Sequence, residues 1–293
     1  MQLFIGIDDT DHPKGGCTTW TSQILGGFIE AEGGVILERR LVRLWPFAPR
    51  RTRGNGAVCL VVETSNPSSI LEVVRSWFNS LIKELGETDL DSHARPGLII
   101  CEDGDLGESI YWKCVRSEFK DIKQIIQDPS IIHCRFSDLG NDGLIGAAAA
   151  VSWRPTNTST FEAIAWRDSS KFGSERRIPS SAIELLEKNH PNTFMNRDPT
   201  RGHGMISPRS PCPVLFGIRA RSQQSALAAL EDILSSKDTE SAQCYAVFKT
   251  NQCSDDHLLG PFRITTMTSP EIQRGGHVTV ATMTNKGPLL IRC

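Results

Sequence analysis

Short apolar runs alternate with segments of helical periodicity over about the first 150 residues, and this alternation limits the possible folds most. Five runs are apolar or β-branched enough to be strands: 3–7, 35–44, 57–64, 98–101 and 131–136. Four segments are predicted to be helices: 18–29, 66–85, 109–127 and 143–151. In the first of these, Trp20, Ile24 and Phe28 recur every fourth position, the spacing of one apolar helix face. The alternation predicts an α/β domain over residues 1–153.

A polar stretch, RPTNTST from Arg154 to Thr160, marks the boundary to a second domain. The elements predicted after it are strand 161–167, helix 180–189, strand 213–219, helix 223–235 and strand 244–250. Two βα-type units and a closing strand fit a ferredoxin-like domain over residues 154–257. The connection at 190–212 is long and rich in Pro, Arg and Gly, and long irregular loops are often functional.

Residues 258–293 contain two strand-like runs, FRITTM and HVTVATM. Thirty-odd residues are too few for a stable barrel, so we expect part of a third domain here. The predicted fold class is therefore α/β plus α+β, in several domains.

Charge and composition narrow the function classes. The formal net charge is −2, which argues against general coating of nucleic acid. Arginines nevertheless cluster in two places, and local basic patches on a near-neutral chain fit phosphate recognition at defined positions. The clustered arginines are Arg39, Arg40, Arg43, Arg50, Arg51 and Arg53, then Arg197, Arg201, Arg209, Arg219 and Arg221.

The nine cysteines are scattered, odd in number and without a C-x-x-C pair. Reduced thiols explain this usage better than a disulfide framework, so we expect a cytoplasmic protein. No apolar run reaches about 18 residues, so no membrane span is predicted.

Three carboxylates, Asp8, Asp9 and Asp11, crowd the end of the first predicted strand. Like charges so close repel one another unless a cation neutralises them, and oxygen ligands of this kind suit Mg²⁺ bound together with substrate phosphates. The alternative is a polar loop whose aspartates only cap turns. We predict that the three aspartates bind metal and take part in catalysis.

The next residues suit phosphate. Thr18 and Thr19 fall at a predicted helix N-terminus, where N–H groups and the helix dipole favour an anion. Lys14 and Gly15 lie between the acids and this helix, so the loop can bind Mg²⁺ on one side and phosphate on the other. A second turn, TRGNGA, places Arg53 and Asn55 beside glycines that allow close backbone approach, although such a turn is about as often only a turn.

Several motifs, in order along the chain, resemble the archaeal tRNA(Ile) 2-agmatinylcytidine synthetase family. They are GIDDTD, KGGCTT, RGNGA, HARPGLII, GLIGAAAA, TFMNRD, PCPVLFGIRA and FKTNQCSDDHL. The resemblance covers essentially the whole chain. It implies a kinase-like N-terminal domain, a ferredoxin-like domain and, over 258–293, the start of an OB-fold.

The resemblance also implies an activity. Such an enzyme uses ATP to phosphorylate C2 of the wobble cytidine in the minor isoleucine tRNA, and the amine of agmatine then displaces the activated oxygen. ATP ends as AMP and phosphate, and the codon read changes from AUG to AUA. The family's phosphorylated threonine matches Thr18, and Asp8, Asp9 and Asp11 match its metal and nucleotide loop.

Other site residues are predicted with less support from the motifs. For ATP or phosphate we expect Lys14, Gly15, Thr19, Arg53, Asn55, Gly143 and Gly146. For tRNA we expect Arg50, Arg51 and Arg219. Agmatine is a dication, so carboxylates should face it, and Asp198 and Glu162 are the candidates.

The chain departs from the family pattern in three respects. No cysteine pair follows residue 258 to form the family's zinc ribbon, which puts tRNA affinity in doubt. Asn141–Gly143 stands where the family often has a Gly-Arg-Gly-like turn, so a phosphate-binding arginine is missing there. His12 and Trp20 replace a small polar residue and a tyrosine. Two alternatives therefore stay open, a paralogue that acts on another RNA or nucleotide, and a non-catalytic RNA-binding protein.

Overall fold

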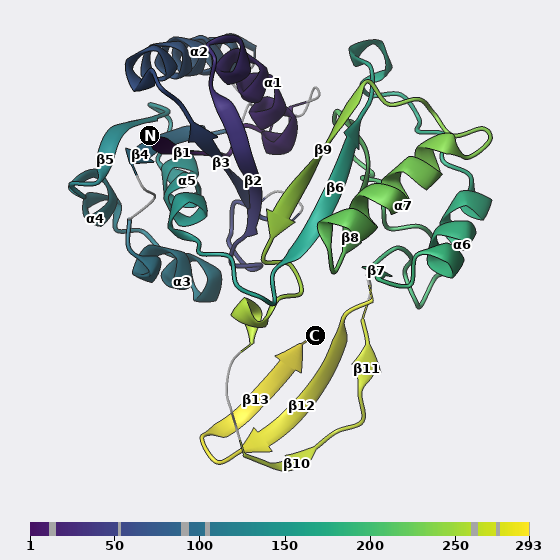
Figure 1. Ribbon diagram of the computed structural model, residues 1–293. Coiled ribbons are helices and arrows are strands. Elements are labelled where there is room, and N and C mark those ends of the chain that lie inside the picture. Colours follow the sequence, from purple (N-terminus) through teal and green to yellow (C-terminus); the bar gives the residue numbers. More distant parts are fainter. Residues whose placement is uncertain are drawn as a thin grey trace.

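A computed structural model describes residues 1–11, 16–51, 54–88, 94–102, 106–258, 263–273 and 276–292, with the side chains of 86–88 left aside. Lys14, Gly15 and Arg53, predicted to contact phosphate, lie outside these residues, as does His12. The protein contains two units that share one sheet, and a second, smaller sheet lies near its C-terminal end (Figure 1).

The elements of the first unit are β1 (Gln2–Asp8), α1 (Thr18–Ala31), β2 (Val35–Arg43), β3 (Gly56–Glu63), α2 (Pro67–Thr88), β4 (Gly97–Glu102), α3 (Glu108–Arg116), α4 (Ile122–Ile126), β5 (Ile131–Phe136) and α5 (Asp142–Ser152). The predicted strands and helices are confirmed, with one exception. The helix predicted over 109–127 is two helices, because the chain is extended at Ser117 and turns again only where the Asp121 side chain caps α4.

The second unit comprises β6 (Thr160–Trp166), η1 (Ser169–Lys171), α6 (Ser180–Asn189), β7 (Thr193–Phe194), β8 (Val214–Ala220), α7 (Gln223–Ser235), β9 (Cys244–Thr250) and η2 (Asp255–His257). The smaller sheet contains β10 (Ile264–Met267), β11 (Glu271–Ile272), β12 (Val278–Thr284) and β13 (Gly287–Arg292). Its predicted strands are confirmed as β10 and β12, and β11 and β13 each pair with β12.

The main sheet has nine strands in the order β5-β4-β1-β3-β2-β9-β6-β8-β7. Within it, β4-β1-β3-β2 and β9-β6-β8-β7 repeat one arrangement, so each unit contains the βαββαβ pattern of a ferredoxin-like sandwich. All neighbouring pairs are antiparallel except β2 and β9, which join the units in parallel through the pairs Arg40 with Lys249 and Leu41 with Thr250. The predicted boundary at 153/154 is therefore crossed by a continuous sheet.

Three apolar cores hold the helices on the sheet. Helices α1 and α2 cover one face of the first unit, with Leu3, Ile5 and Ile7 beneath them. Helices α3 and α5 cover the opposite face, and α6 and α7 pack on the second unit (Figure 1). The core under α1 and α2 continues into the second unit through Trp166 and Phe248, so the two units also share apolar packing.

The predicted apolar stripe of α1 is not its buried face. Ile24 and Phe28 are 41% and 46% exposed, whereas the buried residues are Thr18, Thr19, Thr21, Ser22, Leu25, Gly26 and Ile29. The hydroxyls of Thr21 and Ser22 donate to carbonyl oxygens of the preceding turn, at Cys17 and Thr19, so their burial leaves no donor unpaired. The small residues let the helix approach the sheet closely, which a spacing argument does not detect.

No helix among the residues described here combines the length and apolar character that crossing a membrane requires. The eight cysteines within the described ranges are free thiols, which agrees with the prediction from their spacing.

Candidate active site

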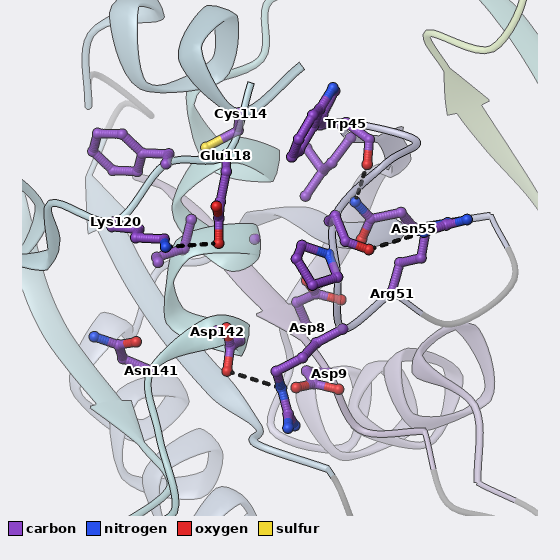
Figure 2. Close-up of a pocket in the computed structure, with 18 of the residues that line it drawn as sticks. Asp8, Asp9, Trp45, Arg51, Asn55, Cys114, Glu118, Lys120, Asn141 and Asp142 are labelled. Carbon is purple, nitrogen blue, oxygen red and sulfur yellow. Dashed lines mark hydrogen bonds and ion pairs between the residues drawn. The ribbon is translucent and has the colours of Figure 1, made fainter. Parts of the chain in front are cut away.

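A cavity of about 400 Å³ opens at the point where β1 ends and α1 and α5 begin (Figure 2). Its other walls come from the β2–β3 connection and from the segment after α3. Asp8, Asp9 and Thr18 line it, so the strand end and the helix start recognised in the sequence border one pocket.

Helix α5 lies directly on Asp8. A Cβ atom at Gly146 would come within 1.8 Å of Asp8 Oδ2, and a Cβ atom at Gly143 would come within 2.4 Å of the Arg95 carbonyl oxygen. Only glycine permits this approach at either position. The two glycines predicted to contact phosphate therefore bring the N-terminus of α5 next to the acid loop, and their contact with phosphate stays a prediction.

The two carboxylates at the end of β1 are electrostatically strained. Burial, reinforced by the charges of Asp9, Asp11 and Asp142, raises the pKa of Asp8 well above its usual value. Burial also raises the pKa of Asp9 to about 6, although its Oδ2 accepts a hydrogen bond from Arg95 N at 3.1 Å. A cation in the cavity would relieve both effects.

The raised pKa of Asp9 predicts a falling stability with pH when no metal is present. The folded chain binds this proton more tightly than the unfolded chain, so the contribution is complete below pH 4 and is lost as the pH rises through 6. From 3.8 to about 6 the loss is about 3 kcal/mol. Urea unfolding in EDTA should show Asp9→Asn gaining stability over wild type between pH 4 and 6.5. A difference that does not change over this interval would contradict the prediction.

Asp11 is hydrogen-bonded to Thr18. Its Oδ1 accepts from Thr18 N at 2.9 Å and from Thr18 Oγ1 at 3.3 Å, so it caps the start of α1. In the part of the chain that the structure describes, no three His, Cys, Asp or Glu side chains are gathered to bind a metal. Binding of a metal by all three aspartates therefore stays a prediction, since Asp11 here accepts hydrogen bonds from Thr18 and Asp9 accepts one from the Arg95 backbone amide.

Thr18 is held by contacts with Thr10 and Asp11 and borders the cavity. Its side chain is 5% exposed, and Thr10 N and Thr10 Oγ1 each lie 3.4 Å from its hydroxyl oxygen. Thr19 instead contacts Cys17 Sγ through its hydroxyl at 3.0 Å and is not part of the cavity wall. Of the two threonines, Thr18 lines the cavity, and the predicted contact of Thr19 with phosphate stays a prediction.

Two arginines supply positive charge beside the acids. Arg95 NH1 lies 2.7 Å and Arg50 Nε 3.3 Å from Asp142 Oδ2, at the first residue of α5. Arg51 also lines the cavity and donates to the Ala48 carbonyl at 3.0 Å. Arg95 and Asp142 were not predicted from the sequence, although both belong to motifs that carry the resemblance or adjoin one.

Removing the Asp142 charge should strengthen phosphate binding. Asp142→Asn lowers the competition for Arg50 and Arg95, so we expect ATP affinity to rise about threefold to tenfold at low salt. Asp138→Asn is the matched control, because Asp138 is 87% exposed and lies outside the cavity wall. Calorimetric titration with ATP measures both. Weaker binding by Asp142→Asn would mean that Asp142 itself orients the arginines for the nucleotide.

The β2–β3 connection is shaped by Asn55. Its φ is +41°, its Nδ2 donates to the Trp45 carbonyl at 2.7 Å, and its own carbonyl accepts from Leu44 N at 2.8 Å. Asn55 thus fixes the loop that presents Trp45 and Arg51 to the cavity (Figure 2). Its predicted contact with phosphate is not tested by this geometry.

Glu162 is neutralised within the fold. Its oxygens lie 2.7 Å from Arg43 NH2 and 3.2 Å from Arg219 NH2. Burial alone would raise the pKa of Glu162, but Arg219 and Arg43 together hold it below its usual value. Neither Glu162 nor Arg219 lines the cavity, and both are committed to each other, so their predicted contacts with agmatine and tRNA lack support here.

Asp198, the other agmatine candidate, lies in the long 190–212 connection and is 1% exposed. Its Oδ1 accepts from Thr200 N at 2.9 Å, Thr200 Oγ1 at 2.5 Å and Arg201 N at 3.2 Å. These bonds shape the loop. Its predicted role toward agmatine stays a prediction.

The far wall of the cavity was not predicted. Cys114, Glu118, Lys120 and Asn141 line it, and Lys120 Nζ lies 3.1 Å from Glu118 Oε1 (Figure 2). Burial raises the pKa of Cys114 to about 12, so this thiol stays protonated. The residues after α3 carry no motif, and only the fold brings them to the site.

Two family models match the chain. One, described as the TiaS TCKD domain, matches residues 4–136, and the other, described as the TiaS FLD domain, matches residues 141–257.

Curated relatives are similar along most of the chain. The isoleucine-tRNA 2-agmatinylcytidine synthetase TiaS of Methanopyrus kandleri is 33% identical over 300 residues, covering 94% of this chain and 66% of the relative. That of Archaeoglobus fulgidus is 34% identical and covers 89% and 60%, and that of Methanosarcina mazei is 31% identical and covers 97% and 70%. The chain thus spans about two thirds of the length of these proteins.

Solved structures agree in fold. A complex of TiaS with its isoleucine tRNA and ATP has a TM-score of 0.82 at 29% identity and covers all of this chain and 72% of its own. A complex of TiaS with the same tRNA, AMPCPP and agmatine has a TM-score of 0.79 at 29% identity, with 100% and 73% covered. Two family models over 4–136 and 141–257, and a 31% identical relative of which 70% is covered, show that this chain belongs to the TiaS family.

Proposed function

We propose that the protein uses ATP to join agmatine to C2 of the wobble cytidine of the minor isoleucine tRNA, which changes decoding from AUG to AUA. The observation that supports this most is the position of the Thr18 hydroxyl. It is buried, bonded to Asp11 and placed at a helix N-terminus that faces a cavity lined by Asp8 and Asp9. An acceptor hydroxyl there meets a phosphoryl group where helix dipole and arginines already stabilise negative charge.

The residues of the cavity suit a nucleotide with its metal. Asp8 and Asp9 line the space, as do Asp142 and Glu118, which are paired with basic side chains. Mg²⁺ is usually held by one or two carboxylates together with substrate phosphates. Mg²⁺ would supply charge neutralisation of the phosphates. Arg50 and Arg95, close to Asp142, add fixed positive charge at the same end.

The chemistry then needs two displacements. The cytosine O2 takes the γ-phosphoryl group of ATP as the bond from that phosphorus to the β,γ-bridging oxygen breaks and ADP is released, so O2 becomes part of a phosphate leaving group. Transfer of the β-phosphoryl group of this ADP to the Thr18 hydroxyl would leave AMP. The agmatine nitrogen forms the new bond to C2, loses a proton, and phosphate departs with the former O2. The protein's part is positioning and charge stabilisation, which dominate catalysis of phosphoryl transfer.

The free cysteines also support a cytoplasmic location, because thiols persist in a reducing compartment.

The test is uptake of radiolabelled agmatine into a transcript of the minor isoleucine tRNA, with ATP and Mg²⁺. The same transcript with uridine at the wobble position is the control and should take up no label. Because the chain spans about two thirds of its relatives, a fusion to the unmatched C-terminal third of the Methanopyrus kandleri protein is assayed beside it. If neither protein labels the tRNA while both consume ATP, the activity belongs to another RNA or nucleotide.

A further inference from the structure

A buried hydrogen-bond network connects the second unit to the walls of the cavity. Its first member is Asp256, in η2 just after β9, which is 6% exposed. Asp256 Oδ2 accepts from Tyr111 OH at 2.6 Å and from Trp153 Nε1 at 2.9 Å. Tyr111 lies in α3 of the first unit, and Trp153 directly follows α5, the last helix of that unit.

Asn251 is the second member and is fully buried. Its Oδ1 accepts from Arg43 N at 2.7 Å, and its Nδ2 donates to Arg43 O at 2.9 Å and to Tyr111 OH at 2.8 Å. The side chain thus pairs with the backbone of Arg43 as a neighbouring strand would. Tyr111 OH donates to Asp256 and accepts from Asn251, so the network is continuous.

Each of the three residues that the network holds belongs to, or directly follows, an element that contributes to a cavity wall. Arg43 is the last residue of β2, directly before Leu44 and Trp45. Tyr111 lies one turn before Cys114, whose carbonyl accepts from Trp45 N at 2.8 Å. Trp153 follows α5, the helix that covers Asp8.

The network is also hard to rearrange. Burial and the hydrogen bond to Asp256 raise the pKa of Tyr111, so its hydroxyl remains a donor at any physiological pH. A buried carboxylate with two donors costs much more when one donor is removed than a surface contact does. The sheet joins the two units through only two residue pairs of β2 and β9, so these side chains add the contacts that fix the connecting end.

We propose that Asp256 and Asn251 are positioning residues for the nucleotide site, although neither lines the cavity. They tie the end of β9 to the β2–β3 connection, to α3 and to the end of α5, so the spacing of the cavity walls depends on the second unit. This proposal rests on the proposed function in that the cavity is taken to bind ATP.

The test compares Tyr111→Phe, Asp256→Leu and Asp256→Asn for ATP affinity without tRNA or agmatine. Tyr111→Phe and Asp256→Leu should weaken binding by about threefold to thirtyfold. Asp256→Asn should bind like wild type, because an amide oxygen at the Oδ2 position can accept from both donors. In steady-state assays of Tyr111→Phe and Asp256→Leu, KM for ATP should rise while kcat stays nearly unchanged. Hydrogen exchange of peptides over residues 44–51 should speed up in the two weakened variants, without nucleotide present.

Glu240→Gln is the matched control for loss of stability. Glu240 pairs with Arg167 at 2.8 Å inside the second unit, both side chains are 1–2% exposed, and neither lines the cavity. Its Tm should fall while ATP affinity stays that of wild type.

The proposal is overturned if Tyr111→Phe and Asp256→Leu bind ATP normally, or if affinity falls in step with Tm in all variants, Glu240→Gln included. Should Asp256→Leu fail to fold, Tyr111→Phe alone tests the proposal, because it removes one hydroxyl and keeps the aromatic ring. A wild-type chain that binds ATP but incorporates no agmatine refutes the proposed function only, because the network is judged on ATP affinity and exchange.

Discussion

Thr18→Ala should abolish incorporation of agmatine into tRNA, with a loss of about a thousandfold or more, the scale seen when an essential nucleophile is removed. The hydroxyl lies 3.3 Å from Asp11 Oδ1, at the start of α1 and against the cavity. The adjacent Thr19 hydroxyl does not replace it, because that hydroxyl is turned to Cys17 and Thr19 does not line the cavity. Label uptake and mass spectrometry of the protein after incubation with ATP measure the product and any phosphothreonine.

Two variants separate chemistry from stability. Thr18→Ser keeps the hydroxyl and should retain most of the activity. Thr21→Ala is the matched control, because Thr21 is 7% exposed and belongs to the same group of buried hydroxyls, 3.0 Å from Thr10 Oγ1. Each alanine variant should lose about 1 kcal/mol of stability. Full activity in Thr18→Ala would exclude Thr18 from the reaction. ATP would then phosphorylate the cytidine without a phosphorylated protein residue.

Local patterns predicted the elements well and their faces less well. Strands such as Ile131–Phe136 and helices such as Ser180–Asn189 are confirmed because their periodicity and their breaks lie in the local sequence. In α1 the same reasoning chose the wrong face, since Thr21 and Ser22 satisfy their own hydroxyls and can be buried while Phe28 is exposed. When a buried helix face consists largely of small residues, the sequence shows no periodic pattern of apolar residues on that face.

The residues of the site also fall into those that the local sequence predicts and those that only the fold brings together. Asp8, Asp9 and Thr18 were predicted because they follow one another along a strand–loop–helix segment, so sequence neighbours are also spatial neighbours. Arg95 and Asp142 meet across 47 positions, and Asp256 meets Tyr111 across 145. Such contacts depend on the sheet order and on which helix covers which face, neither of which a single sequence determines. Glu162 looked free in the sequence for the same reason, because both its arginines come from other strands.

Gly146→Ala should disable the site by displacing Asp8. The added methyl group would lie 1.8 Å from Asp8 Oδ2 and 2.7 Å from its Cγ, so the carboxylate or the helix must move. Helix α5 has little room to move, because it already lies against β1 and β4. A Cβ atom added at Gly97 would lie 2.0 Å from Leu144 N, and one added at Gly6 would lie 2.4 Å from Ala147 O. We expect agmatine incorporation to fall by about a hundredfold or more, as when reacting groups are misplaced by about 1 Å, and stability by about 1–3 kcal/mol.

A double-mutant cycle shows whether the clash with Asp8 is the cause. In an Asp8→Ala background the added methyl group meets no carboxylate, so most of the stability cost of Gly146→Ala should disappear. Gly27→Ala is the matched control in a helix, since its Cβ would meet nothing within 4 Å, and it should stabilise the protein by about 0.5–1 kcal/mol. Urea unfolding measures the four corners of the cycle, and label uptake compares Gly146→Ala and Gly27→Ala with wild type. An equal stability cost with and without the Asp8 carboxylate would place the strain in the α5 backbone instead, and the activity loss would then reflect a shifted helix N-terminus.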